Sequence, residues 1–135
     1  MSDAREVSDT ELAYIAGFFD GEGCISGGIE RRGYAFLHVS ISQKFDTPLL
    51  FIQARFGGKI WPCKGRDMYQ WHLNGQGALE LLRAILPYLM LKRPQAELAI
   101  EFLETRTTSG RHYTPVQSAR RLALVTEISA LKRVG

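Results

Sequence analysis

The feature of this sequence that most constrains its fold is a short helical segment with one face that carries almost no side chain. Ser8 and Glu11 have the spacing of a capping box, and the apolar residues that follow recur at helical intervals, which predicts a helix over residues 9–21. Three small residues spaced four apart share one face of this helix: Ala13, Gly17 and Gly21. Such a face lets another backbone come close. On spacing alone an ordinary core element is the commoner neighbour, and a second helix is the alternative.

The predicted helix ends in two carboxylates among glycines, in the order Asp20, Gly21, Glu22, Gly23. The helix dipole disfavours anions at a C-terminus by roughly 0.3 to 1 kcal/mol. A divalent cation held by carboxylate and backbone carbonyl oxygens would offset this cost. We expect Asp20 to bind local backbone groups. Glu22, flanked by glycines, is the better candidate for a metal ligand.

Alternating residues after this helix predict a sheet. Between Tyr34 and Gln43, small or aliphatic residues alternate with polar or aromatic ones, which is the two-residue period of a strand with one buried face. Similar criteria predict further strands over residues 24–30, 59–63 and 68–73, and helices over residues 47–56, 77–86, 93–105 and 116–133. Thr47, just before Pro48, is expected to cap the second helix. The order αββαββα with an additional helix at the end predicts an α+β fold.

Length and charge narrow the class of protein. With 135 residues, 45% of them hydrophobic, the chain suits a single domain over residues 1–135. It has 17 Lys and Arg against 14 Asp and Glu, and this net charge of +3 is a mild bias toward polyanions. Residues 24–72 contain seven basic and three acidic residues, and seven minus three leaves +4. The positive charge is therefore concentrated in the segment that contains the predicted strands.

The cysteines and the N-terminal residues predict the cellular compartment of the protein. Cys24 and Cys63 occur in a chain without a recognisable signal peptide, so we expect both thiols to be unpaired in a reducing environment. The N-terminal residues are acidic and polar, and no apolar run approaches the length of a membrane span. We expect a soluble intracellular protein. The sequence does not decide between an organelle, a bacterium and a phage.

The end of the first helix also resembles a known motif. Residues 15–23, IAGFFDGEG, are similar to the nine-residue LAGLIDADG motif, with both motif glycines and both acidic positions filled. The resemblance is to the LAGLIDADG homing endonucleases, and it implies a curved antiparallel sheet that binds in the DNA major groove. It also implies that Glu22, with the Gly21 carbonyl oxygen, binds the catalytic Mg²⁺ or Mn²⁺. Because only one motif is present, the single-motif type is implied, a homodimer with a near-palindromic site. The implied dimer interface contains Ala13, Ala16, Gly17 and Gly21.

Residues 41–44 and 89–96 also resemble segments of this family, and each contains a position that completes the family's active site. By position, Gln43 would orient water or a phosphate oxygen, and Lys92 would stabilise developing negative charge. Without the resemblance, a polar residue at a strand end and a solvated lysine at a helix start would be the simpler interpretations. The chain departs from the family twice. Glu22 stands where many members have Asp, and Thr47 stands where a subgroup has arginine, a charge that Lys44 could replace.

Strand parity predicts which side chains face DNA. The first two strands would present Ser26, Gly28, Glu30, Tyr34, Phe36, His38 and Ser40. The hairpin would present Lys59, Trp61, Cys63, Met68, Gln70 and His72, with Ile60, Tyr69, Trp71 and Leu73 inside. Cations in loops would bind phosphates: Arg31, Arg32, Lys44, Lys64 and Arg66. Trp61 has two interpretations, because an exposed indole either contacts DNA or covers the sheet edge.

The function that these features predict is metal-assisted phosphodiester hydrolysis on double-stranded DNA. A homodimer would hold Mg²⁺ with Glu22 of each subunit and cut both strands of a long, near-palindromic site. Members of the same fold also serve as RNA splicing maturases that bind intron RNA, or as regulators that bind DNA without cutting it. A purely structural dimer is a third possibility, but it leaves Glu22 and the basic strands unexplained.

Overall fold

The order of helices and strands follows the order that the sequence predicts. The computed structural model describes residues 6–105 and 113–134. Its elements are α1 (Asp9–Glu22), β1 (Gly23–Ile29), β2 (Ala35–Gln43), α2 (Thr47–Phe56), β3 (Lys59–Pro62), β4 (Tyr69–Asn74), α3 (Gly75–Ile85), the 3-10 turn η2 (Leu86–Tyr88), α4 (Arg93–Glu104) and α5 (Pro115–Val134). The predicted α+β class and the αββαββα order with further helix at the end are confirmed. No helix among the described residues is long and apolar enough to cross a membrane.

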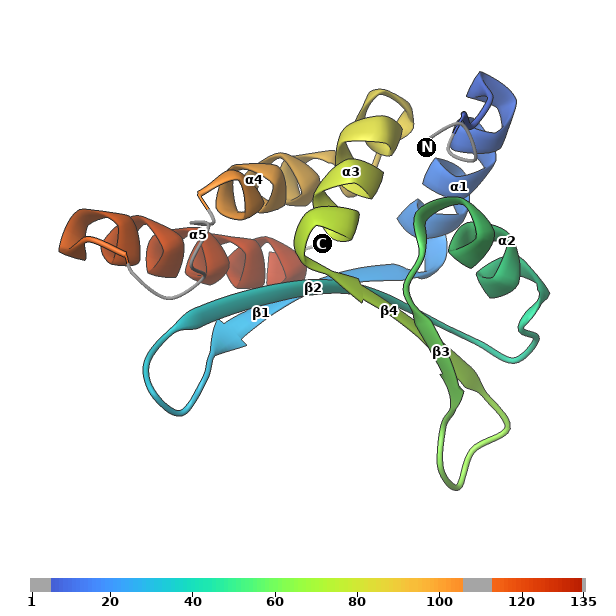
Figure 1. Ribbon diagram of the computed structural model, residues 1–135, viewed down its shortest axis with the longest axis horizontal. Helices are drawn as coiled ribbons and strands as arrows, with labels where there is room; N and C mark the ends of the chain where they lie inside the picture. The colour runs from blue at the N-terminus through green and yellow to red at the C-terminus, as the bar shows by residue number, and fades with distance from the viewer. Residues whose placement is uncertain (1–5, 106–112, 135) are drawn as a thin grey trace.

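The four strands form one antiparallel sheet in the order β1-β2-β4-β3. All five α-helices lie on one side of this sheet (Figure 1), and the opposite side is left open. The sheet is curved, and the β1–β2 and β3–β4 turns bend away from the helices at its two ends. The open face is therefore concave.

Strand parity predicts correctly which side of the sheet is buried. The side chains of Ile25, Val39 and Trp71 are fully buried between sheet and helices. Ile60 and Tyr69, predicted to lie inside, are partly buried and pack against this core. Strands with one buried face are the arrangement that an alternating pattern favours, because every second side chain points away from the core.

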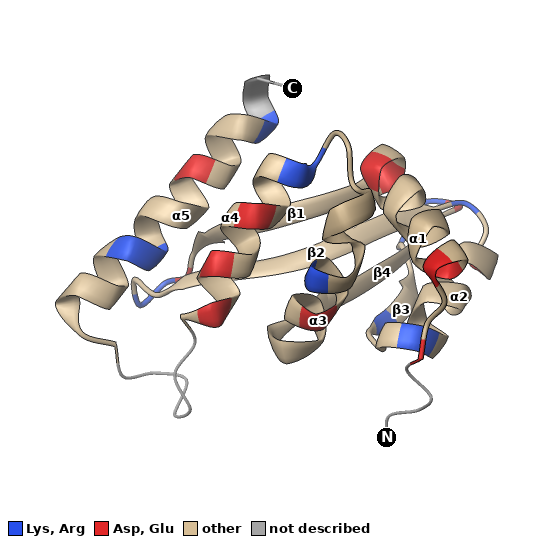
Figure 2. Ribbon diagram, turned by 90° about the horizontal axis from the view of Figure 1, so that it is seen from above, with Lys and Arg blue, Asp and Glu red and all other residues tan. Residues whose placement is uncertain are grey.

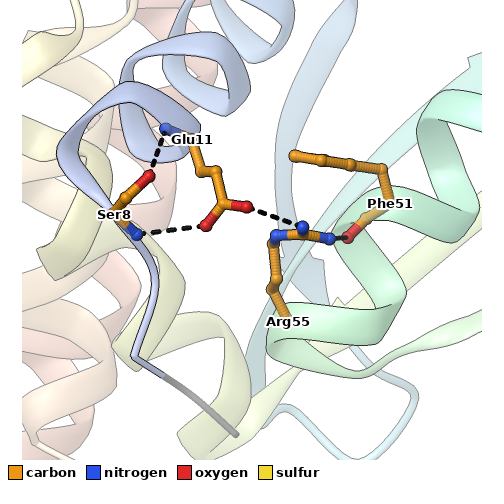
Figure 3. Close-up of polar contacts among 4 residues, drawn as sticks. All are labelled: Ser8, Glu11, Phe51 and Arg55. Atoms are coloured by element: carbon orange, nitrogen blue, oxygen red, sulfur yellow. Dashed lines mark hydrogen bonds and ion pairs between the residues drawn. The ribbon is translucent and has the colours of Figure 1, made fainter.

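The predicted capping box at the start of α1 is confirmed, and its Glu11 side chain also contacts α2. The Ser8 hydroxyl oxygen accepts from the Glu11 amide, and Glu11 Oε1 accepts from the Ser8 amide, both at 3.1 Å. Glu11 Oε2 accepts a 2.8 Å hydrogen bond from Arg55, and the Arg55 guanidinium lies 3.6 Å from the centre of the Phe51 ring (Figure 3). The Arg55 hydrogen bond and the Ser8 amide hold the pKa of Glu11 below its usual value.

Several element boundaries differ from prediction by one or two residues. Thr47 is the first residue of α2 rather than its cap; Asp46 precedes the helix and makes no side-chain capping bond. Helix α3 begins at Gly75, directly after β4 and two residues before the predicted start. The prediction missed these two residues because they lie outside the apolar pattern that locates the helix. Cys63 and Met68 lie just beyond the hairpin strands, although the Cys63 amide still donates to the Met68 carbonyl at 2.8 Å.

Candidate nucleic-acid interface

Glu22 lies exposed at the junction where α1 passes directly into β1. No loop separates the two elements, and Gly23 makes this possible: a Cβ at that position would overlap the ring of Phe19, which is fully buried beneath it. The Gly23 amide donates to the Phe19 carbonyl and ends the helix. The second carboxylate of the motif is thus presented to solvent at a rigid corner.

Asp20 has a different role from Glu22. Its two carboxylate oxygens accept from the amides of Met90 at 2.7 Å, Leu91 at 3.2 Å and Lys92 at 2.9 Å. Asp20 binds backbone groups as expected, but the prediction that these groups are local is wrong, because they lie about 70 residues away. A carboxylate facing three amides is a strong, charge-assisted arrangement.

The same contact brings Lys92 to the end of α1. Lys92 Nζ donates a 2.7 Å hydrogen bond to the Asp20 carbonyl oxygen, so the side chain runs back along the C-terminal turn that carries Glu22. Gln43 is half-buried at the end of β2, two residues beyond Ile41, the register partner of Gly23. The three predicted catalytic residues therefore come from separate parts of the chain and gather around the α1–β1 junction.

Two oxygen donors at this junction are of the kind that binds a divalent metal. Carboxylate and carbonyl oxygens are the ligands that Mg²⁺ prefers, and Glu22 and Gly21 supply one of each. The Gly21 carbonyl is among the last four of α1, which have no partner within the helix. In the described part of one chain, no group of three or more His, Cys, Asp or Glu residues can hold a metal ion. The described residues of one chain thus offer two candidate oxygen ligands, from Glu22 and Gly21.

The small-residue face of α1 points out of the molecule. Ala13, Gly17 and Gly21 are exposed, and a Cβ built on either glycine meets nothing within 4 Å. This chain's own core therefore does not cover the face. The prediction that Ala16 lies in a dimer interface is wrong, because Ala16 is fully buried with Ile15. Successive helical residues are rotated by about 100°, which turns Ala16 into its own core and away from a partner.

A row of rings crosses the concave face from β2 to β3. Phe36 and His38 lie 6.2 Å apart between ring centres, His38 and His72 4.3 Å, and His72 and Trp61 5.8 Å. These four residues, which we call the ring row, are all predicted DNA contacts. At its β3 end lies a hollow of about 490 Å³ lined by Gly58, Lys59, Trp61, His72, Leu73 and Asn74.

Most of the other predicted DNA contacts are exposed or half-buried. On the strands and beside them these are Ser26, Gly28, Glu30, Tyr34, Cys63, Met68 and Gln70. The prediction that Ser40 contacts DNA is wrong, since only 9% of this residue is exposed. Cys24 and His72 are its partners on the two neighbouring strands, and a short side chain between two larger ones offers little surface to DNA. The Glu30 carboxylate accepts from the Arg32 amide at 2.7 Å, which places it within the β1–β2 turn.

Charges are distributed unequally between the helices and the sheet. Acidic residues form bands on the helices in the view from above (Figure 2). Several cations of the helix layer are paired with these acids, as in the Arg83–Glu104 and Arg120–Glu101 ion pairs. The predicted DNA contacts that carry positive charge form no ion pair with any other described residue: Arg31, Arg32, Lys44, Lys59, Lys64 and Arg66. These cations are available to an external anion.

One cation of the open face is missed by the sequence analysis. Lys132, near the end of α5, reaches across the edge strand β1, and its Nζ lies 3.2 Å from Cys24 Sγ and 3.4 Å from Ser26 Oγ. Burial raises the pKa of the Cys24 thiol, but the hydrogen bonds from Ser26 and Lys132 outweigh it, so the net pKa is lowered. Burial, His72 and Lys132 together lower the pKa of His38. Nothing in the local pattern distinguishes Lys132 from a solvated lysine.

Comparison with known proteins shows which protein family the chain is similar to. The profile of the LAGLIDADG endonuclease family matches residues 15–104. The DNA endonuclease I-CvuI of Chlorella vulgaris is 32% identical over 103 residues, which cover 70% of this chain and 64% of that protein. The match thus spans less than two thirds of that relative.

Solved structures agree with the fold. An archaeal intron-encoded homing endonuclease, I-Vdi141I, complexed with DNA, superposes with a TM-score of 0.78 at 22% identity, covering 91% of this chain and 84% of that one. At this identity the likeness supports the fold alone. I-CvuI in complex with a DNA target, uncleaved in the presence of 2 mM Mg, gives a TM-score of 0.78 at 26% identity, covering 90% and 82%.

Proposed function

Because the chain belongs to the LAGLIDADG endonuclease family, we propose that it is a homing endonuclease that makes metal-dependent double-strand breaks as a homodimer. The observation that carries the proposal is the exposed small-residue face of α1, which ends at the exposed Glu22. A surface for a second copy and half of a metal site thus occupy the same helix.

The proposed dimer pairs the outer faces of two α1 helices about a two-fold axis. Gly17 and Gly21 have room for a second backbone, because no described residue lies within 4 Å of a Cβ built on either. The pairing places two Glu22 carboxylates and two Gly21 carbonyls near the axis, which completes the oxygen ligand set. A two-fold symmetric protein recognises a site with matching symmetry, so the target is near-palindromic.

The concave sheet face is proposed to bind the DNA major groove. A two-stranded β-ribbon fits that groove, and side chains on its outer face reach base edges. The half-buried strand residues Ser26, Gln70 and His72 have donors and acceptors suited to base edges. Unpaired cations in both turns, among them Arg31 and Arg66, suit phosphates on either side of the groove.

The chemistry proposed at the α1–β1 junction is phosphodiester hydrolysis. Bound Mg²⁺ or Mn²⁺ would supply a Lewis acid that neutralises phosphate charge and acidifies water. Lys92, oriented by Asp20, brings an ammonium group to the phosphate, where it stabilises developing negative charge. The Gln43 amide orients water or a phosphate oxygen by hydrogen bonding. Lys44, exposed beside Gln43, is the cation available in place of the arginine that a subgroup has at Thr47.

The test is cleavage of a randomised duplex library by the purified protein in Mg²⁺, in Mn²⁺ and in Ca²⁺, followed by sequencing of cut ends. We expect a long near-palindrome, cut in Mg²⁺ or Mn²⁺. Glu22→Gln is expected to bind this site and not cut it, because the metal loses a ligand. Glu127→Gln, an exposed carboxylate on α5, makes the same chemical change outside the motif helix and should cut normally.

Two outcomes would overturn the proposal. If the library is bound but not cut with any metal, the protein is a binding module, and structured intron RNA is the next ligand to test. If Glu22→Gln cuts as well as the unmutated protein, the α1 end is not the metal site.

A further inference from the structure

We propose that the hollow at the β3 end of the ring row reads a thymine·adenine base pair, with Trp61 in contact with the thymine methyl group. The proposal rests on the proposed function, since it names a base within the DNA site. The hollow has a volume of about 490 Å³ and opens on the concave face. Its lining combines an apolar wall with two polar side chains that no neighbour in the described chain uses.

The apolar wall of the hollow is the indole of Trp61. Trp61 is 40% exposed, and its neighbour Ile60, on the opposite side of the strand, is the residue that packs against the core. The indole therefore does not serve the core. The half-buried His72 ring lies 5.8 Å from it between ring centres, tilted by 39°, and also lines the hollow. A small apolar group in the hollow gains contacts with the exposed indole.

The polar side of the hollow comes from Lys59 and Asn74. Lys59 is exposed, is the register partner of His72 and forms no ion pair among the described residues. Asn74 immediately precedes α3, a position where asparagine normally caps the helix, but its side chain makes no capping hydrogen bond. It is exposed on the same face as His72, two residues along β4. One ammonium donor and one free amide thus flank the apolar wall.

Thymine paired with adenine is the base pair that matches this lining. In the major groove thymine presents its methyl group beside the O4 acceptor, and adenine presents N7 and the N6 amino group. The methyl packs against the exposed Trp61 indole, Lys59 donates to O4, and the Asn74 amide pairs with adenine N7 and N6. Cytosine presents an amino donor toward Lys59 and has no methyl, so it meets a like donor. Guanine offers Lys59 acceptors but leaves the apolar wall empty.

The test replaces thymines of the isolated target with deoxyuridine, one position at a time, which removes only the methyl group. At one position in each half-site we expect about fourfold weaker binding, the effect of one buried methyl-sized group. Trp61→Ala should bind thymine and uracil equally at that position, whereas Trp61→Phe should keep part of the difference. Leu122→Ala, which removes an exposed apolar side chain from α5, is the control and should leave the difference at that position intact.

Intrinsic fluorescence provides a second readout. The chain has two tryptophans, and Trp71 is fully buried, so a change on adding the duplex reports on Trp61. We expect the duplex to shield Trp61 from acrylamide quenching. If the duplex is bound but no position shows a thymine preference that depends on Trp61, this inference is overturned and the endonuclease proposal stands. If the protein binds no duplex, both proposals are overturned.

Discussion

At the scale of single residues, the electrostatics of the open face depends on two side chains far apart in sequence. Lys132 places its ammonium group at the β1 edge, beside Cys24 and Ser26. His38, in the middle of the ring row, has a lowered pKa because of burial, His72 and Lys132. At neutral pH His38 is therefore a neutral donor and acceptor suited to base edges, and Lys132 is a fixed cation suited to phosphate.

We expect Lys132→Ala to weaken the salt dependence of DNA binding. A lysine that neutralises a phosphate contributes about 0.9 to the slope of log K against log salt concentration, so the slope should fall by roughly that amount per chain. Fluorescence anisotropy of a labelled duplex in Ca²⁺, at several salt concentrations, measures it. Arg120→Ala removes a cation of the helix layer and should leave the slope unchanged. An unchanged slope in Lys132→Ala would exclude the phosphate contact.

We expect His38 to make the folded chain less stable in mild acid. Its pKa is lower in the folded than in the unfolded state, so between the folded value and about 6.5 the unfolded chain binds more protons. The free energy of unfolding therefore falls as pH drops through that window, and the loss is absent above it. Urea unfolding between pH 5 and 7.5 should show a weaker pH dependence for His38→Gln. Identical profiles would contradict the expectation.

At the scale of elements, the motif helix is coupled to the segment before α4. The three amides that bind the Asp20 carboxylate belong to Met90, Leu91 and Lys92, between η2 and α4. This contact orients the lysine and also joins two elements that are distant in the chain. Asp20 is thus a positioning residue, whereas Glu22, two residues later, faces solvent.

We expect Asp20→Asn to lower the free energy of unfolding by about 1 to 3 kcal/mol, because an amide nitrogen would then face backbone donors. Chemical denaturation measures the change. Glu22→Gln is the matched control: a similar charge is removed at an exposed position, and stability should hardly change. Equal stability of Asp20→Asn and the unmutated protein would show that the three amides do not depend on the carboxylate.

At the scale of the whole molecule, the helices cover one side of the sheet and leave two surfaces free. These are the concave sheet face and the outer face of α1 (Figure 1). The first suits a large ligand with a convex surface, and the second suits a helix. In the proposed dimer the two surfaces act together, because pairing the α1 helices sets the distance between two DNA-reading sheets.

We expect Gly17→Leu to abolish the dimer without unfolding the chain. Inside the chain a side chain at this position meets nothing within 4 Å, and leucine is a better helix former than glycine by roughly 0.8 kcal/mol. Between two paired helices the added side chain would keep the backbones apart. Sedimentation velocity should show a monomer with normal circular dichroism and no cleavage. Ala123→Leu, on the exposed surface of α5, should remain dimeric. A dimeric Gly17→Leu would place the interface elsewhere.

Much of this arrangement was predictable because it depends on neighbours within a few residues. The capping box at Ser8, the parity of Val39 and Ile41, and the small-residue face at Gly17 are local patterns with a fixed helix or strand period. The prediction that Thr47 caps α2 was wrong, because a proline near the start of a helix is compatible with more than one first residue. Ala16 was misassigned because a helix presents adjacent residues in different directions, and only packing shows which of them is inside.

What the tertiary structure alone decides is which distant residues meet. The sequence by itself determines the α+β order, the core side of each strand and the acidic end of the first helix, since these follow from backbone geometry and burial of apolar groups. The amides that bind Asp20, the reach of Lys132 across β1, the burial of Ser40 and the hollow beside Trp61 all depend on contacts between separate elements. No local period encodes these contacts, because they form only when the sheet curves and the helices pack on one side of it.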